Sequence, residues 1–196
     1  GKTVTVISYT DTTYYALLGM LSKVGLTKND VTIQAAGPAG VWQQFAAKKA
    51  VAMAGVPDWT ASAMEAGAQV DILPADVYFK SMAQAILASD ETIQKNPQLI
   101  QKLVRATLRG MKDIMANPKE AAVAYVQHVP AHKGKEAGIQ GVFEMYNKYV
   151  YANQKVLGQM DEARLGELQK FYVSNAVVPK ETPLKDLYTN QFVASK

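Results

Sequence analysis

Three short polar and aromatic segments each lie between a strand-like run and a helix-like run, and their residue types suit the binding of a small solute. The first follows the apolar run of residues 3–7 and consists of Tyr9, Thr10, Asp11, Thr12 and Thr13. N–H groups at the start of the next helix can hold an anionic or carboxylate ligand there, although the Asp11 charge disfavours a highly charged anion. Helix capping is the structural alternative, because Ser, Thr and Asp are the usual caps.

The second and third segments add glycine and tryptophan to this pattern. Their candidate binding residues are Gly40, Val41 and Trp42 in the second segment, and Pro57, Asp58 and Trp59 in the third. Glycine lets a backbone approach a ligand closely, and a tryptophan ring offers a flat apolar wall. The structural alternatives are a turn at residues 37–40 followed by a core tryptophan, and an N-cap at Asp58 followed by packing.

The residue types that support catalysis or metal binding are sparse. The chain has no cysteine, and its two histidines, His128 and His132, are separated by Pro130 and so do not share a helix face. A phosphate-binding loop, a nucleophile elbow and a pattern of paired carboxylates are all absent from the sequence. We therefore predict no catalytic residue, no metal site and no cofactor.

Alternating strands and helices in the first half indicate an α/β fold with a parallel sheet covered on both faces. Apolar runs predict strands at residues 3–7, 31–35, 51–56 and 69–73. Apolar spacing of three and four residues predicts helices at residues 12–24, 41–49 and 57–66. The carboxyl ends of parallel strands form ligand sites in such sheets, so the three polar segments should lie together.

The second half is predicted to be mainly helical. One further strand is expected at residues 82–88, and Asp90 and Asp161 are expected to cap helices. The helical patterns cover residues 90–95, 97–116, 119–129, 133–149 and 163–176, and the tail from residue 178 is expected to be loop with one short turn.

Composition narrows the class of protein further. The chain has 196 residues, of which 48% are hydrophobic, and a net charge of +4 with a pI of about 9.1. Lysine and arginine are scattered among acidic residues, which argues against a nucleic-acid-binding surface. No apolar run reaches the roughly 18 residues that cross a bilayer, and no signal peptide is recognised in the sequence.

The order of several segments resembles the type II periplasmic solute-binding proteins of ABC transporters, in the group that binds nitrate, alkanesulfonates, taurine and thiamine pyrimidine precursors. The resemblance covers nearly the whole chain, and AGVPDWTASA matches best. The other segments are GKTVTV, LSKVGLTKNDVTI, ILASDETIQKNPQLIQKLVRATLRGMKDIMANPKEAAVAYV, DEARLGELQKFYVSNAVV and PLKDLYTNQFV.

The resemblance implies a periplasmic-binding-protein-like fold of type II. Residues 1–75 would form one complete three-layer α/β lobe, and residues 76–196 would form the helical C-terminal part of the other lobe, whose N-terminal part is not encoded here. The implied function is capture of a small anionic or aromatic solute in a cleft between lobes, with a hinge near residues 75–82. The implied location of the protein is the periplasm, or a lipid-anchored position outside the cell membrane. The solute would pass from it to an ABC permease.

Two other functions share this fold and are kept as alternatives. One is an enzyme of pyrimidine-precursor or menaquinone synthesis, and the other is the ligand-sensing domain of a regulator. Apolar stripes such as Leu99 and Leu103, and Leu165, Leu168 and Phe171, lead us to expect that the chain needs the missing half-lobe or a second copy of itself as a partner. Nucleic acid is not an expected partner.

Overall fold

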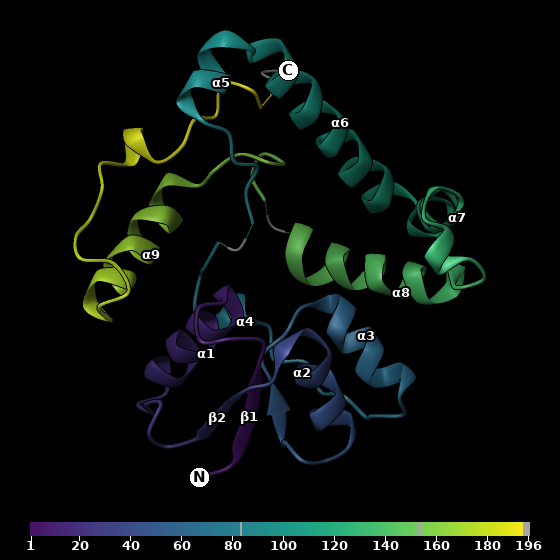
Figure 1. Cartoon of the computed structure of the whole chain (residues 1–196), viewed down its shortest axis with the longest axis vertical. Helices are drawn as coiled ribbons and strands as arrows, with labels where there is room; N and C mark the ends of the chain where they lie inside the picture. Colours follow the sequence, from purple (N-terminus) through teal and green to yellow (C-terminus); the bar gives the residue numbers. More distant parts are fainter. Residues whose placement is uncertain (83, 153, 194–196) are drawn as a thin grey trace. The chain divides into compact units, whose positions relative to one another are not determined.

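The computed structural model describes residues 1–82, 84–152 and 154–193, and it divides the chain into two compact units (Figure 1). Unit 1 is Gly1–Ala83 and unit 2 is Gln84–Lys196. Unit 1 is mixed α/β and unit 2 is helical, so the chain as a whole has the α/β character that the sequence predicts. The assignment of residues 1–75 and 76–196 to two lobes stays a prediction.

Unit 1 is built on a small parallel sheet in the order β2-β1-β3. Strand β1 (Thr3–Val6) is central and pairs with β2 (Thr32–Ala35) and with the short β3 (Ala52–Met53). The three residues Val4, Thr5 and Val6 are buried, as expected for a central strand covered on both faces. This confirms the predicted parallel sheet and places the three strand ends on one edge.

Four helices accompany this sheet, and their bounds are α1 (Thr12–Lys23), α2 (Gly37–Ala46), α3 (Pro57–Glu65) and α4 (Ala75–Tyr78). Because the chain moves from β1 outward to β2 and then back past β1 to β3, right-handed connections place α1 and α2 on opposite faces. Helix α2 packs on β1 and on α3, and α1 packs on α4. Gly25 has the predicted left-handed conformation after α1, with φ +75°.

Close packing of α1 requires a glycine at position 19. A methyl group on Gly19 would collide with the ring of Phe79, and Gly19 is buried. We expect Gly19→Ala to lower the free energy of unfolding of unit 1 by about 1–2 kcal/mol, because overpacking outweighs the better helix propensity of alanine. Urea unfolding followed by the fluorescence of Trp42 and Trp59 reports on unit 1 alone, since both tryptophans lie there.

The matched control for this substitution is Gly110→Ala. Gly110 also lies inside a helix, α6 (Pro97–Ala116), but a methyl group there meets open space. This variant should gain up to about 1 kcal/mol from helix propensity. Because Gly110 lies in unit 2, its unfolding is followed by far-UV circular dichroism and not by tryptophan fluorescence. A Gly19→Ala chain as stable as the unchanged protein would show that the Phe79 ring moves aside at little cost.

Four expectations for unit 1 are wrong or need new bounds. The segment at 37–40 is the first turn of α2 and not a separate turn, because Pro38 needs no N–H partner at a helix start. Val56 and not Asp58 is the N-cap of α3, and Asp58 lies inside the first turn. The strand expected at 51–56 is only β3, and no strand forms at 69–73, where Ile72 and Leu73 are exposed.

Unit 2 contains five α-helices among its described residues: α5 (Asp90–Lys95), α6, α7 (Pro118–His128), α8 (Glu136–Tyr146) and α9 (Glu162–Ser174). Short helical turns follow as η1 (Pro130–His132), η2 (Asn147–Tyr151) and η3 (Leu184–Asp186). Helix α7 packs on α6 and α8, and the buried residues include Ile100, Ala122, Val126, Val142, Leu168 and Phe192.

Helix starts in unit 2 follow the sequence with one change of cap. Asp161 caps α9 by accepting a hydrogen bond from the Arg164 N–H, as predicted. Ser89, and not Asp90, caps α5, because its hydroxyl accepts from the Thr92 N–H and Asp90 is the first helical residue. The strand expected at 82–88 is wrong at Met82 and at 84–88, while residue 83 lies outside the described residues.

The apolar stripes of unit 2 differ in their exposure. Leu168 is buried, so the α9 stripe finds a partner within unit 2, where it faces the segment after the helix. Leu99 and Leu103 on α6 are 60% and 48% exposed. The expected need for a second polypeptide therefore concerns α6 more than α9, and it stays a prediction.

Two carboxylates should make the folded protein less stable at acidic pH. Hydrogen bonds from the Thr27 backbone N–H (2.7 Å) and hydroxyl (2.8 Å) lower the pKa of Asp30. A hydrogen bond from the Arg164 backbone N–H (3.1 Å) lowers the pKa of Asp161. A carboxyl whose folded pKa lies below its unfolded value of about 3.9 stabilises the fold above that value and loses this contribution as pH falls through the folded pKa.

We therefore expect the urea concentration at the unfolding midpoint to decrease as the pH drops below about 4. In the double variant Asp30→Asn, Asp161→Asn this decrease should be smaller. Asparagine keeps an oxygen that can accept both hydrogen bonds, so the comparison isolates the charge. Unfolding curves at pH 3, 4 and 6 provide the measurement. An unchanged pH dependence in the double variant would show that other groups cause the acid sensitivity.

Candidate functional site

The three strand–helix junctions of unit 1 lie side by side, as the sequence predicts for a parallel sheet (Figure 1). The backbone connects them directly: the Gly37 N–H donates to the Ile7 carbonyl (3.1 Å), and the Ala54 N–H donates to the Thr5 carbonyl (2.9 Å). The buried Thr5 hydroxyl donates to the Val41 carbonyl at 2.8 Å, which joins β1 to α2. We call the residues 8–13, 37–42 and 54–60 the carboxyl edge of unit 1.

At the first junction, Asp11 acts as a helix cap. Its Oδ1 accepts hydrogen bonds from the Thr13 N–H (2.9 Å) and the Thr13 hydroxyl (2.5 Å). Ser8 and Thr10 lie before it, with their hydroxyl oxygens 3.2 Å apart. The carboxylate of Asp11 therefore occupies the position at the α1 N-terminus that an anionic ligand would take.

Tyr9 at the same junction is a large aromatic residue that remains 52% exposed. Its hydroxyl donates to the Ile33 carbonyl of β2 at 3.2 Å. Its ring meets that of Tyr14 edge to face, with centroids 5.5 Å apart, and Tyr14 in turn lies 5.4 Å from the ring of Tyr15. Sequence analysis named Tyr9 but did not include Tyr14 among the binding residues, although its place in the first turn of α1 was a usable signal.

The second junction offers less to a ligand than the sequence suggests. Val41 is fully buried, so its side chain belongs to the core and only its carbonyl takes part in the junction. Gly40 and Trp42 are half-buried. The N–H groups of Ala36 and Gly37 already donate to the Val6 and Ile7 carbonyls, and Pro38 has no N–H. In the first turn of α2, the Ala39 N–H is therefore the remaining group that has no carbonyl one turn earlier within the helix.

At the third junction, the ring of Trp59 covers the backbone before the helix. Its Cε3 lies 3.2 Å from where a Cβ on Gly55 would be, so a side chain at that position would press on the ring. Trp59 is half-buried and Asp58 is exposed. The Thr60 hydroxyl donates to the Val56 carbonyl at 3.2 Å and steadies the first turn of α3. Capping and packing thus account for part of this segment.

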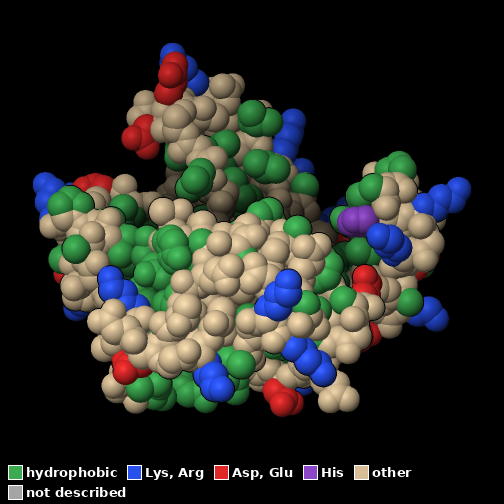
Figure 2. All heavy atoms as spheres, turned by 60° about the horizontal axis from the view of Figure 1, so that its bottom comes forward, with side chains coloured by type: hydrophobic (Ala, Val, Ile, Leu, Met, Phe, Trp, Pro, Cys, Tyr) green, Lys and Arg blue, Asp and Glu red, His purple; other side chains and the backbone are tan. Residues whose placement is uncertain are grey.

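The charge of the carboxyl edge is negative. Among the eleven predicted binding residues, Asp11 and Asp58 carry carboxylates and none is lysine or arginine. On the face of the described chain that Figure 2 shows, lysine and arginine side chains are spread out, with acidic side chains among them. The carboxyl edge is therefore better suited to a neutral solute than to an anion.

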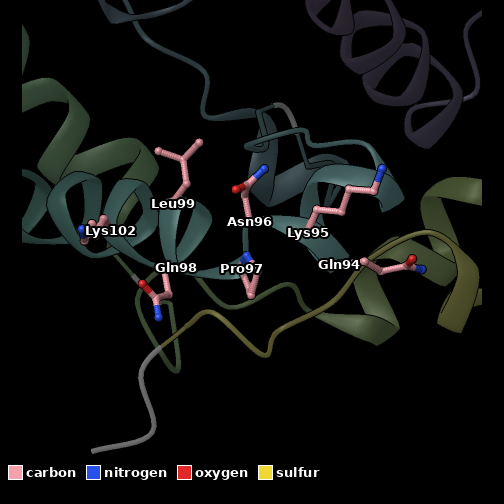
Figure 3. A pocket seen from close by; sticks show the side chains of 7 residues that line it. All are labelled: Gln94, Lys95, Asn96, Pro97, Gln98, Leu99 and Lys102. Atoms are coloured by element: carbon pink, nitrogen blue, oxygen red, sulfur yellow. The ribbon is translucent and has the colours of Figure 1, made fainter.

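Two cavities of the described chain are lined by residues of unit 2 and by none of the junction residues. A surface depression of about 530 Å³ lies where α5 meets α6, and Figure 3 shows that its side chains spread outward and do not converge on one point. Its Lys95 is paired with Glu91 at 2.7 Å. A second cavity of about 220 Å³ lies between α9 and the following segment, lined by residues such as Leu165, Leu168 and Tyr172.

The two histidines have structural surroundings. The Nδ1 of His128 lies 2.9 Å from the Ala124 carbonyl, one turn earlier in α7. The ring of His132 lies 5.6 Å from that of Tyr125, which meets Phe143 edge to face. Within the described residues, no three His, Cys, Asp or Glu side chains are grouped closely enough to hold a metal ion. Within the same residues, none of the helices has both the length and the apolar character to cross a membrane.

Comparison with known proteins supports the resemblance found in the sequence. Residues 1–121, more than half of the chain, match the family described as NMT1/THI5 like. The chain is also 27% identical over 197 aligned residues to the riboflavin-binding protein RibY of Chloroflexus aurantiacus, an alignment that covers 98% of this chain and 56% of that protein. The chain thus spans little more than half the length of this relative. On the match over residues 1–121, this chain belongs to the NMT1/THI5-like family of the solute-binding group that its sequence resembles.

Proposed function

We propose that this chain takes a small, neutral, planar aromatic solute of the riboflavin type at the carboxyl edge of unit 1. The observation that carries the proposal is the place of Asp11, whose carboxylate already accepts the hydrogen bonds of Thr13 at the α1 N-terminus. An anion such as nitrate or a sulfonate would have to displace or approach that charge. A neutral solute pays no such electrostatic penalty, so the aromatic alternative is favoured over the anionic one.

Aromatic side chains at the same edge support the choice of a planar solute. Tyr9 is largely exposed and Trp42 and Trp59 are half-buried, so each retains surface that a flat ring can cover. Binding sites for small molecules are typically lined by apolar and aromatic side chains with a few polar groups. Here the polar groups are the hydroxyls of Ser8 and Thr10 and the Ala39 N–H at the start of α2.

The relative from Chloroflexus aurantiacus points to the same ligand class, since it is named for riboflavin binding. By the same family argument, we extend the proposal to transport: the chain serves as the solute-binding component of an ABC importer, outside the cell membrane or in the periplasm, and passes its solute to a permease. Ligand capture by hinge closure near residues 75–82 is part of this proposal.

Isothermal titration calorimetry of the 196-residue chain with riboflavin, taurine and nitrate in parallel tests the proposal. We expect saturable binding of riboflavin and at least tenfold weaker binding of nitrate and of taurine, a zwitterion whose sulfonate carries the negative charge. Asp11→Ser keeps a helix cap but removes the charge. This variant should bind riboflavin within about threefold of the unchanged chain and should bind taurine or nitrate more tightly.

The reverse order of affinities would contradict the proposal. Tight binding of taurine or nitrate to the unchanged chain, with no heat from riboflavin, would return the site to the anion-binding class. Turnover of any of these solutes would favour the enzyme alternative instead.

A further inference from the structure

Tyr9 is the most exposed of the aromatic residues that the sequence places at the carboxyl edge of unit 1, yet it is held at both ends. Its hydroxyl donates to the Ile33 carbonyl of β2 at 3.2 Å, and its ring meets Tyr14 of α1 with an angle of 76° between planes. Tyr9 nevertheless remains 52% exposed to solvent. An aromatic ring that is fixed but uncovered has surface available for another ring.

Because Tyr14 is itself held in place, the orientation of the Tyr9 ring does not depend only on the hydrogen bond from the Tyr9 hydroxyl. The backbone N–H of Tyr14 donates to the Asp11 carbonyl at 3.1 Å in the first turn of α1, and its ring lies 5.4 Å from that of Tyr15. Tyr9 is therefore positioned by β2 through its hydroxyl and by α1 through its ring. Such preorganisation lowers the entropy that must be lost when a ligand binds.

We infer that the exposed ring of Tyr9 is the platform on which the planar ring system of the solute stacks. This inference deepens the proposed function and rests on it, because it assigns one residue to the recognition of the aromatic part of the ligand. Stacking requires a π-face on both partners, so Tyr9 distinguishes a flat heterocycle from a non-planar solute of similar size. Asp11 lies two residues further on and acts separately, through its charge against anions.

The ring and the hydroxyl of Tyr9 have different roles. The ring provides the stacking surface, whereas the hydroxyl is already engaged by the Ile33 carbonyl and sets the orientation of the ring. Removal of the hydroxyl alone should therefore change affinity little, because Tyr14 still contacts the ring. Removal of the aromatic character should change it much more.

Titration of riboflavin fluorescence with the full chain tests this assignment, using Tyr9→Phe, Tyr9→Leu and Tyr149→Leu. Stacking on the phenol ring of Tyr9 should quench the emission of bound riboflavin by electron transfer, which a phenylalanine ring does not support. We expect Tyr9→Leu to raise the Kd for riboflavin about tenfold and to reduce the quenching, and Tyr9→Phe to stay within about threefold. Tyr149→Leu makes the same chemical change in η2 of unit 2 and should leave both values unchanged.

Each outcome has a distinct meaning. If the unchanged chain binds riboflavin and Tyr9→Leu binds it equally well with equal quenching, the inference is overturned while the proposed function stands. If calorimetry detects no riboflavin binding to the unchanged chain, the proposed function fails and the inference falls with it; binding without quenching overturns the inference alone. Circular dichroism of Tyr9→Leu checks its fold. Tyr9→Phe tests the assignment through the Kd, measured by calorimetry, even if the leucine variant is unstable: a tenfold rise in the Kd of the phenylalanine variant also overturns it.

Discussion

Replacing Leu168 with alanine is expected to lower the free energy of unfolding of unit 2 by about 2–5 kcal/mol. Leu168 lies on α9 and is only 5% exposed, and it borders the cavity of about 220 Å³ between α9 and the segment after it. Leu168→Ala removes buried apolar atoms and enlarges the existing cavity beside α9. The cost therefore includes both a transfer contribution and a cavity contribution.

Urea unfolding followed by far-UV circular dichroism measures this effect, since helices dominate unit 2. The matched control is Leu87→Ala, because Leu87 is in the same unit and 90% exposed. The control should change stability by less than about 0.5 kcal/mol. An equal effect of the two substitutions would show that α9 does not pack on the rest of unit 2 as described.

Replacing Val6 with alanine is expected to lower the free energy of unfolding of unit 1 by about 2–3 kcal/mol. Val6 is fully buried in the central strand β1, and its carbonyl accepts the Ala36 N–H at 2.9 Å just before α2. The loss of two methyl groups contributes roughly 0.8 kcal/mol each, and the cavity that remains adds to this. Because Val6 ends the strand that leads into the first junction, riboflavin affinity should fall as well.

Tryptophan fluorescence during urea unfolding reports this change within unit 1. Val24→Ala is the control, since Val24 follows α1 and is 59% exposed. Stability that is unchanged in Val6→Ala would contradict the central, doubly covered position of β1.

Much of the fold could be predicted because its signals are local. Apolar spacing located α6 and α9 closely, and Asn117-Pro118 marked the start of α7, where Asn117 caps the helix through the Glu120 N–H. Strand β1 was evident because a short apolar run with β-branched residues suits a covered central strand. In each case the residues that specify the element lie within it or at its ends.

The sequence predicts the wrong structure where residues distant in the sequence decide the conformation of a segment. Residues 69–73 alternate like a strand, but a strand also needs a hydrogen-bonding partner, and β3 has only two residues to offer at that edge. The glycines at residues 37–40 favour a turn, but Pro38 is equally suited to the first turn of a helix. The Thr5 hydroxyl donates to the Val41 carbonyl, and no local pattern could reveal this contact between residues 36 positions apart.

For the candidate site, the sequence located the three junctions but not the role of each residue. Helix capping at residues 10–13 is one of the alternatives that the sequence leaves open, and the side-chain arrangement assigns the cap to Asp11. The contact of Tyr14 with Tyr9 follows from that arrangement alone. On these two contacts we propose a neutral aromatic ligand, where the sequence leaves an anionic or an aromatic one.

Hydrogen–deuterium exchange of the full chain with and without saturating riboflavin tests the central claim most directly, because it locates the ligand. The account predicts slower exchange at the carboxyl edge of unit 1, in residues 8–13, 37–42 and 54–60, where strand ends and helix starts meet. Protection confined to unit 2, at the depression of residues 94–102 or at the cavity beside α9, would contradict it.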